Sequence, residues 1–156
     1  MSRECKIRIK IGNGEIQDAI STWGFHLMES DDIVVPPLKD YEYEQYPESA
    51  AVEMYPYTTM KTFDYSCTLL AIGNESTVNT TIKNFYDSLF EITTGVDLRR
   101  ALPITIYNDW KGISVTGYVK ILDGKDSYPK LTEHEKGAFL FDFNIFVSDP
   151  KTLLPL

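Results

Sequence analysis

The chain has 156 residues, which suits a single domain over residues 1–156 with a sizeable core. Its formal net charge is −8 and its basic residues are scattered, which argues against nucleic acid and membrane surfaces as partners, because phosphate binding needs clustered Lys and Arg. There is no signal peptide and no apolar run of about 18 residues, so we expect a soluble protein that is made in a cytoplasm and not secreted.

The first thirty residues predict short strands joined by a tight turn. Apolar residues alternate with basic ones at the start, a pattern typical of a half-buried strand: Cys5, Ile7, Ile9 and Ile11. Gly12-Asn13-Gly14 then predicts a hairpin turn, because Asn and Gly tolerate positive φ. Residues 15–20 fit either a strand that pairs back or a short helix over 16–20. A second alternating strand is expected over residues 23–28.

Residues 30–56 form the least regular region of the sequence. Pro36-Pro37 interrupts any strand or helix, and acids then alternate with tyrosines over residues 40–48. This Tyr/Glu-rich run fits an exposed edge strand or an extended loop. Because long loops inside compact domains are usually functional or mobile, we expect this one to lie on the surface and contact a partner.

Residues 76–91 are the one segment that predicts a long helix, because its large apolar residues fall on one face: Val78, Ile82, Phe85, Tyr86, Leu89 and Phe90. Ser76 or Thr77 can cap its start, and Gly95 is the nearest residue that can end it. Its first turns use poor helix formers at a cost of roughly 2–3 kcal/mol. Burying the apolar face is worth on the order of 10 kcal/mol, so the helix should form only by packing on a sheet.

The remaining segments predict strands of that sheet. Residues 62–72 alternate with five apolar residues on one face, and Leu70 and Ile72 suggest that the helix covers the other face at the far end. After a linker over 95–101, residues 102–107 and 113–121 predict a hairpin around a turn at 108–112. A long loop over 123–137 and a strand over 139–147 follow. The apolar tail, residues 151–156, is expected to dock on this domain or on a neighbour.

Together these elements predict a mainly β fold of the α+β class. We expect an antiparallel β-sandwich or open barrel of about seven or eight strands, with one helix packed across it.

No motif in the sequence points to catalysis, a cofactor or a metal. Cys5 and Cys67 fall inside strand-like runs, so we expect buried, reduced thiols. His26 and His134 lack an oriented partner and are interpreted as structural or surface residues. A carboxylate pair for glycoside hydrolysis or a calcium site could be drawn from five acids, but no spacing supports it: Asp31, Asp32, Glu42, Glu44 and Glu48.

The residues that we expect to contact a partner are tyrosines of the irregular region and leucines of the tail: Tyr41, Tyr43, Tyr46, Leu153 and Leu154. Tyrosine supplies a large contact area at a low entropic cost, so a binding surface for protein or glycan is one interpretation of the first group. Core or loop packing is the other, for each tyrosine taken singly.

Several segments resemble the opening of phage and prophage tail proteins of the distal-tail type: Asp18-Ala19, Thr22-Trp23-Gly24-Phe25, Leu27 and Pro36-Pro37-Leu38-Lys39-Asp40-Tyr41. A strand like residues 63–70, a helix like residues 82–90 and a closing strand near Asp149-Pro150 also fit that family. The usual loop between the early strands is replaced here by the Tyr/Glu run. Tail-tube and tail-terminator proteins share a similar arrangement of sheet and helix, so the resemblance does not decide between these positions in the tail.

The resemblance implies a non-enzymatic structural subunit that assembles with itself into a ring, commonly a hexamer, and with neighbouring tail proteins. It implies a location in the bacterial host cytoplasm during assembly and then in the virion tail. The alternatives are a β-sandwich binding module that uses the Tyr-rich loop and, with less support, a hydrolase that uses loop carboxylates.

Overall fold

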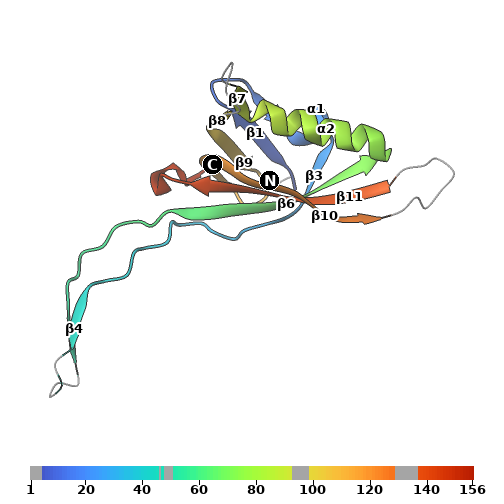
Figure 1. Cartoon of the computed structure of the whole chain (residues 1–156). Helices are drawn as coiled ribbons and strands as arrows, with labels where there is room; N and C mark the ends of the chain where they lie inside the picture. Colours follow the sequence, from blue (N-terminus) through green and yellow to red (C-terminus); the bar gives the residue numbers. More distant parts are fainter. Residues whose placement is uncertain (1–4, 46, 48–50, 93–98, 129–136) are drawn as a thin grey trace.

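The computed structural model describes residues 5–45, 47, 51–92, 99–128 and 137–156, and it shows a curved antiparallel sheet with one long helix (Figure 1). Seven strands of the main sheet run in the order β2-β1-β9-β10-β11-β6-β3, and β12 pairs with β10. Their bounds are β1 Ile7–Ile11, β2 Ile16–Asp18, β3 Phe25–Ser30, β6 Phe63–Gly73, β9 Ile104–Asn108, β10 Ile113–Tyr128, β11 Gly137–Val147 and β12 Leu154–Pro155. The predicted mainly β fold with a helix packed across it is confirmed, and the sheet is open.

Strand β10 gives the sheet its curvature, because its first part pairs with β9 and β12 and its second part pairs with β11. Register shifts at Val119/Ile121 and Gly124/Asp126 bend the strand. At Gly117 a Cβ atom would lie 2.4 Å from the carbonyl oxygen of Phe146, so a larger residue does not fit. The two halves of the sheet therefore contribute to a single hydrophobic core.

The sequence prediction of a loop over 123–137 was wrong at both ends, since β10 continues to Tyr128 and β11 begins at Gly137. Pairing across this extension joins Ser127 with Phe139 and Tyr128 with Ala138. Backbone hydrogen bonds hold such a polar strand end, so alternation of apolar residues gives no signal for it.

Helix α2, Glu75–Ser88, packs its predicted apolar face on the core. Phe85 is fully buried, with ring centroids 4.9 Å from Trp23, 5.3 Å from Phe25 and 5.4 Å from Phe143. Asn74, rather than Ser76 or Thr77, caps the helix by accepting a hydrogen bond from the backbone N–H of Ser76 at 3.0 Å.

The helix ends three residues earlier than predicted, because the chain enters strand β7, Phe90–Ile92, which pairs with β8, Arg99–Ala101. The expected linker over 95–101 is therefore a strand in its last three residues. Gly95 lies outside the described residues.

Leu70 and Ile72 had suggested that the helix covers the outer face of β6, but it does not. Phe85 contacts Phe25 and Phe143, which lie opposite Ala71 and Cys67 of β6 and share their buried face. On the other face Ile72 is 56% exposed. The apolar pair at the end of β6 is thus not a sign of two-sided burial.

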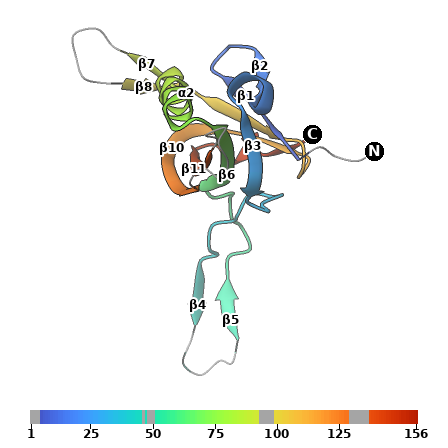
Figure 2. The same ribbon diagram turned by 90° about the vertical axis from the view of Figure 1, so that its right-hand side faces the viewer.

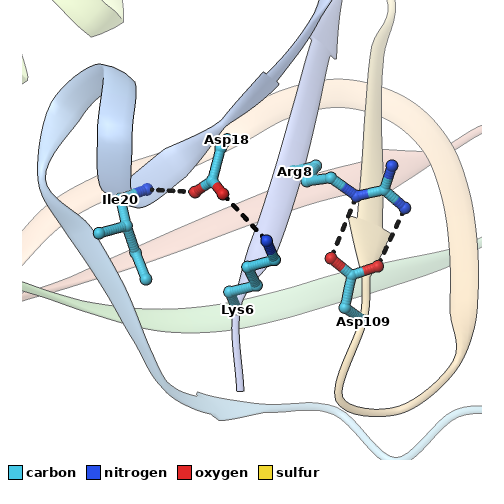
Figure 3. A network of polar contacts seen from close by, with 5 residues as sticks. All are labelled: Lys6, Arg8, Asp18, Ile20 and Asp109. Atoms are coloured by element: carbon cyan, nitrogen blue, oxygen red, sulfur yellow. Dashed lines mark hydrogen bonds and ion pairs between the residues drawn. The ribbon is translucent and has the colours of Figure 1, made fainter. Parts of the chain in front are cut away.

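The N-terminal segment contains both of the alternatives left open by the sequence. Strand β2 pairs back on β1 around Gly12, and helix α1, Ala19–Trp23, follows at once. Asp18 joins them, since its carboxylate accepts from the N–H of Ile20 at 2.9 Å and from Lys6 at 3.1 Å (Figure 3). Partial burial opposes ionisation, but the hydrogen bonds from Lys6 and Ile20 outweigh it and lower the pKa of Asp18.

A second ion pair ties β1 to the turn after β9. The Arg8 guanidinium donates two hydrogen bonds to the Asp109 carboxylate, at 3.1 and 2.9 Å (Figure 3).

Both cysteines are free, as expected, and Cys67 is buried. Cys5 is exposed, contrary to the prediction, because β1 begins two residues after it.

The apolar tail docks on this domain. The 3-10 helix Pro150–Thr152 leads into β12, which lies beside the start of β10, and Leu153 is buried against the core.

None of the described helices is long and apolar enough to cross a membrane.

Candidate interaction site

The most prominent surface feature is an arm formed by residues 31–62, which leaves the end of β3 and returns at the start of β6. It projects far from the body of the protein in both views, with β4, Tyr43–Gln45, and β5, Val52–Met54, in its outer part (Figures 1 and 2). The expected irregular loop is therefore a long two-stranded excursion.

Backbone hydrogen bonds join the two sides of the arm at intervals. The N–H of Lys61 donates to Pro37 at 2.7 Å, that of Lys39 to Thr59 at 2.9 Å, and that of Tyr55 to Glu42 at 2.9 Å. Prolines at positions 36, 37 and 56 have no N–H to donate. Because they interrupt both the ladder and the apolar alternation, the sequence pattern did not reveal this pairing.

The root of the arm is fixed to the body by two aspartates. Asp31 pairs with Ser66 of β6 twice: its N–H donates to the Ser66 carbonyl at 3.0 Å, and its carboxylate accepts from the Ser66 N–H at 2.9 Å. The neighbouring Asp32 carboxylate forms an ion pair with Lys111, in the turn between β9 and β10. Two of the acids weighed as catalytic or metal-binding candidates thus have a structural role.

A buried asparagine supports the same root from inside. The Asn108 side-chain amide donates to the hydroxyls of Ser30 at 2.9 Å and Tyr65 at 2.8 Å, and its oxygen accepts from the Lys111 N–H at 3.0 Å. Burial raises the pKa of Tyr65 to about 12. Sequence reasoning treated Asn108 only as a turn residue, and no local pattern indicates its partners, which come from β3 and β6.

The arm exposes many large apolar side chains. Nine residues of this kind are at least 38% exposed: Val34, Val35, Leu38, Tyr41, Tyr43, Met54, Tyr55, Tyr57 and Met60. A two-stranded excursion has no core in which to bury them, and clustered exposed apolar residues commonly mark an interaction surface. Together with its length, this composition makes the arm the candidate interaction site.

The outer arm contains a shallow hollow of about 790 Å³; it is lined by Tyr41, Glu42, Tyr43, Glu44, Met54, Tyr55, Pro56 and Tyr57. Tyr43 lies directly opposite Met54, so the two side chains share one face. Tyr41 is 40% exposed and Tyr43 is 66% exposed, while Tyr46 lies outside the described residues.

The arm also concentrates the negative charge of the chain. Residues 31–62 contain seven acids and two lysines, a net charge of −5 out of −8 for the whole chain. The described residues contain no group of three or more His, Cys, Asp or Glu placed to hold a metal ion. Asp31 and Asp32 lie at the root, whereas Glu42 and Glu44 line the outer hollow, so the candidate carboxylates are not brought together.

Other residues singled out in the sequence take different places. His26 is partly buried on β3 opposite Leu70, and His134 and Glu48 lie outside the described residues. In the tail, Leu154 is 55% exposed but Leu153 is only 7% exposed. Of those two leucines, Leu154 is the exposed one.

Comparisons with known proteins extend this description. No protein-family model and no curated protein matches the sequence. Among solved structures, the Dit protein of phage SPP1, described as a paradigm of the hub adsorption apparatus in phages that infect Gram-positive bacteria, matches 92% of this chain at a TM-score of 0.59 and 13% identity. The tail of an empty GTA particle matches 90% of each chain at 10% identity, with a TM-score of only 0.39.

The chain spans about half the length of the SPP1 protein, since the match covers 50% of it. At 13% identity the similarity establishes the fold, and it confirms at that level the resemblance to distal-tail proteins found in the sequence. The protein has the fold of part of the SPP1 Dit protein.

Proposed function

We propose that the protein is a non-enzymatic structural subunit of a phage or prophage tail, of the distal-tail or tail-tube type, that assembles into a ring. The observation that carries this proposal is the fold shared with the SPP1 Dit protein over 92% of the chain. The acids considered for catalysis do not compete with it, since Asp31 and Asp32 hold the arm root and Glu42 and Glu44 line an open hollow.

The body offers suitable surfaces for ring contacts. The sheet ends at β2 on one side and β3 on the other, and both ends carry exposed apolar residues: Ile16 on β2, Ile20 in the adjoining helix α1, and Met28 on β3. A ring needs two different surfaces that fit each other and repeat around a closed rotation. The arm supplies a further contact with a neighbouring component of the particle.

Electron microscopy of the purified chain tests this function. We expect closed rings of uniform diameter in negative stain at protein concentrations that favour assembly. A matched variant with Ile16 and Met28 changed to Lys should keep the fold, because both side chains are exposed, and should lose the rings. Particles of monomer size only, for both proteins, would count against the proposal.

A binding module for glycans is the second candidate, and the hollow with four tyrosines favours it, because aromatic rings stack on sugar faces. A glycan array separates the two functions. Specific glycan binding that disappears when Tyr41 and Tyr43 are changed to Ala, without any ring formation, would support the binding module instead.

A further inference from the structure

We infer that the arm is a rigid, pre-bent projection, in which two elbows fix the angle of its outer part relative to the body. This shape is a property of the single chain and does not depend on ring formation. The arm runs away from the body and changes direction before it reaches β4 (Figure 1). The cause of the bend lies in how the outgoing and returning sides of the arm are paired.

The inner elbow arises because the two sides of the arm differ in length between paired residues. At the root, Ser30 pairs with Cys67. Farther out, Leu38 pairs with Met60. Between these pairs the outgoing side has seven residues, 31–37, and the returning side has only six. One extra residue on one side bends an antiparallel pair, as it does in a β-bulge, so the arm turns here.

The outer elbow has the opposite asymmetry. It begins at the pair of Leu38 and Met60 and ends at the pair of Tyr43 and Met54. Here the returning side has five residues, 55–59, and the outgoing side has only four. The second extra residue cancels the register shift of the first, so the arm turns twice while β4 and β5 remain paired.

Proline occupies the longer side of both elbows. Pro36 and Pro37 lie in the inner elbow, and Pro56 lies in the outer one. The proline ring fixes φ near about −65° and also restricts the residue before it. Because proline has no N–H to donate, it is tolerated where the ladder is interrupted. Each elbow therefore bends at positions where the backbone has little freedom left.

Hydrogen bonds across the arm hold each elbow closed. The two bonds of Asp31 fix the root, and the Lys61 N–H donates to the Pro37 carbonyl at 2.7 Å between the elbows. Within the outer elbow the Thr58 hydroxyl donates to the Lys39 carbonyl at 2.6 Å. A partner would thus meet the arm in one orientation, and its binding would not have to offset the entropy of ordering the arm.

Double electron–electron resonance on the full chain measures the angle of the arm as a distance. Spin labels are attached at Tyr43→Cys in β4 and Lys151→Cys on the body, two exposed positions, after Cys5→Ser removes the exposed native thiol. Cys67 is buried and stays unlabelled. An excess of unlabelled chain keeps the measured distances within one chain where copies assemble. We expect a single narrow distance distribution.

Proline substitutions separate the elbows from the rest of the arm. Pro36→Ala with Pro37→Ala frees the inner elbow, and Pro56→Ala frees the outer one. Pro47→Ala is the matched control, because Pro47 lies in the turn beyond β4 and in neither elbow. We expect each elbow variant to broaden the distance distribution at least about twofold, and the control to leave it unchanged.

A deletion tests the role of the extra residue itself. Val34 is exposed in the inner elbow, and deleting it gives the two sides of that elbow equal length. The bend should then decrease, so the mean distance should shift by more than the width of the original distribution. Thermal unfolding checks that each variant is folded.

A broad distribution in the parent labelled chain would overturn the inference, because the arm would then move at its elbows. Equal broadening in Pro47→Ala, or an unchanged mean distance after the deletion of Val34, would overturn it as well. These results leave the tail function standing, since electron microscopy of rings tests that function separately. A narrow distribution that only the elbow variants broaden, in a chain that forms no rings, would support the inference and contradict the tail function.

Discussion

Phe85 is the side chain on which helix α2 depends. It is fully buried, and its ring contacts those of Trp23, Phe25 and Phe143, so three other elements meet at this residue. The first turns of the helix use poor helix formers, and their cost must be offset by this packing. The sequence identified Phe85 from its spacing alone.

Changing Phe85 to Ala should reduce the free energy of unfolding by roughly 3–5 kcal/mol, because the substitution leaves a cavity that the surrounding rings cannot fill. Urea denaturation measures the change. Phe146→Ala is the control, since Phe146 is 39% exposed on the outer face and its loss should cost much less. A loss below about 1 kcal/mol at Phe85 would mean that the helix is not packed as described.

Tyr65 links the core to the arm root and makes stability sensitive to alkaline pH. Its ordinary pKa is 10.0, and burial raises the pKa to about 12 in the folded chain. The unfolded chain therefore releases the phenolic proton first as pH rises. The stabilisation due to the neutral phenol is complete below pH 10 and is lost between about pH 10 and 12.

We expect the free energy of unfolding to fall over that interval with a contribution from Tyr65 of at most about 1.4 kcal/mol per pH unit. Tyr65→Phe should be less stable at neutral pH, because Asn108 loses a partner, but its pH slope should be shallower. Denaturation at several pH values gives both quantities. Identical slopes for the two proteins would show that Tyr65 does not titrate as described.

At the scale of the elements, strand β10 determines whether the two halves of the sheet can share one core. Gly117 lies where β10 passes close to the backbone of β11, and the register shift at Val119/Ile121 follows it. Beyond this bulge Leu122 packs on the core, whereas strict alternation from Ile113 would place Ile121 on that face.

Gly117→Ala should therefore cost about 2 kcal/mol or more, since its Cβ atom would lie 2.4 Å from a backbone oxygen that must move. Gly124→Ala in the same strand is the matched control, because no heavy atom lies within 4 Å of its added Cβ. It should change stability by less than about 0.5 kcal/mol. Equal effects of the two substitutions, measured by thermal unfolding, would contradict this account of the curvature.

The hydrogen bonds between Asp31 and Ser66 hold the root of the arm, and a substitution at Asp31 tests them. Asp31→Ala removes the carboxylate that accepts from the Ser66 N–H. We expect hydrogen exchange of the Ser66 amide to become at least about tenfold faster, because a charge-assisted bond at the root is lost. Asp40→Ala, an exposed change farther along the arm, should leave that rate unchanged. If the rate at Ser66 does not rise in Asp31→Ala, the root is held in another way.

The periodicity of apolar residues predicted the regular strands and the helix. It did not predict contacts between residues that lie far apart in the sequence. The alternating strand at 139–147 and the helix at 76–91 were found because each buries one face at a regular spacing. The arm and its root were not found, because prolines interrupt the first and the second joins residues of β3, β6 and β9 that lie far apart in the sequence. Exposed tyrosines were correctly placed on the surface, although no alternation could show that they line a common hollow.

At the scale of the whole molecule, the protein consists of a curved body with a helix on its core and a long acidic arm (Figure 2). The body has the fold of part of a phage distal-tail protein. The arm carries more than half of the net charge and half of the ten tyrosines. The arm therefore holds a disproportionate share of both the charge and the tyrosines of the chain.

Sedimentation velocity of the purified chain over a wide range of concentrations tests the central claim, that the protein is a self-assembling structural subunit. The account predicts one discrete multimer that grows at the expense of the monomer, and high salt should favour it by screening the charge of −8 on each copy. A single species with the mass of one chain at the highest concentration, at low and at high salt, would contradict the claim.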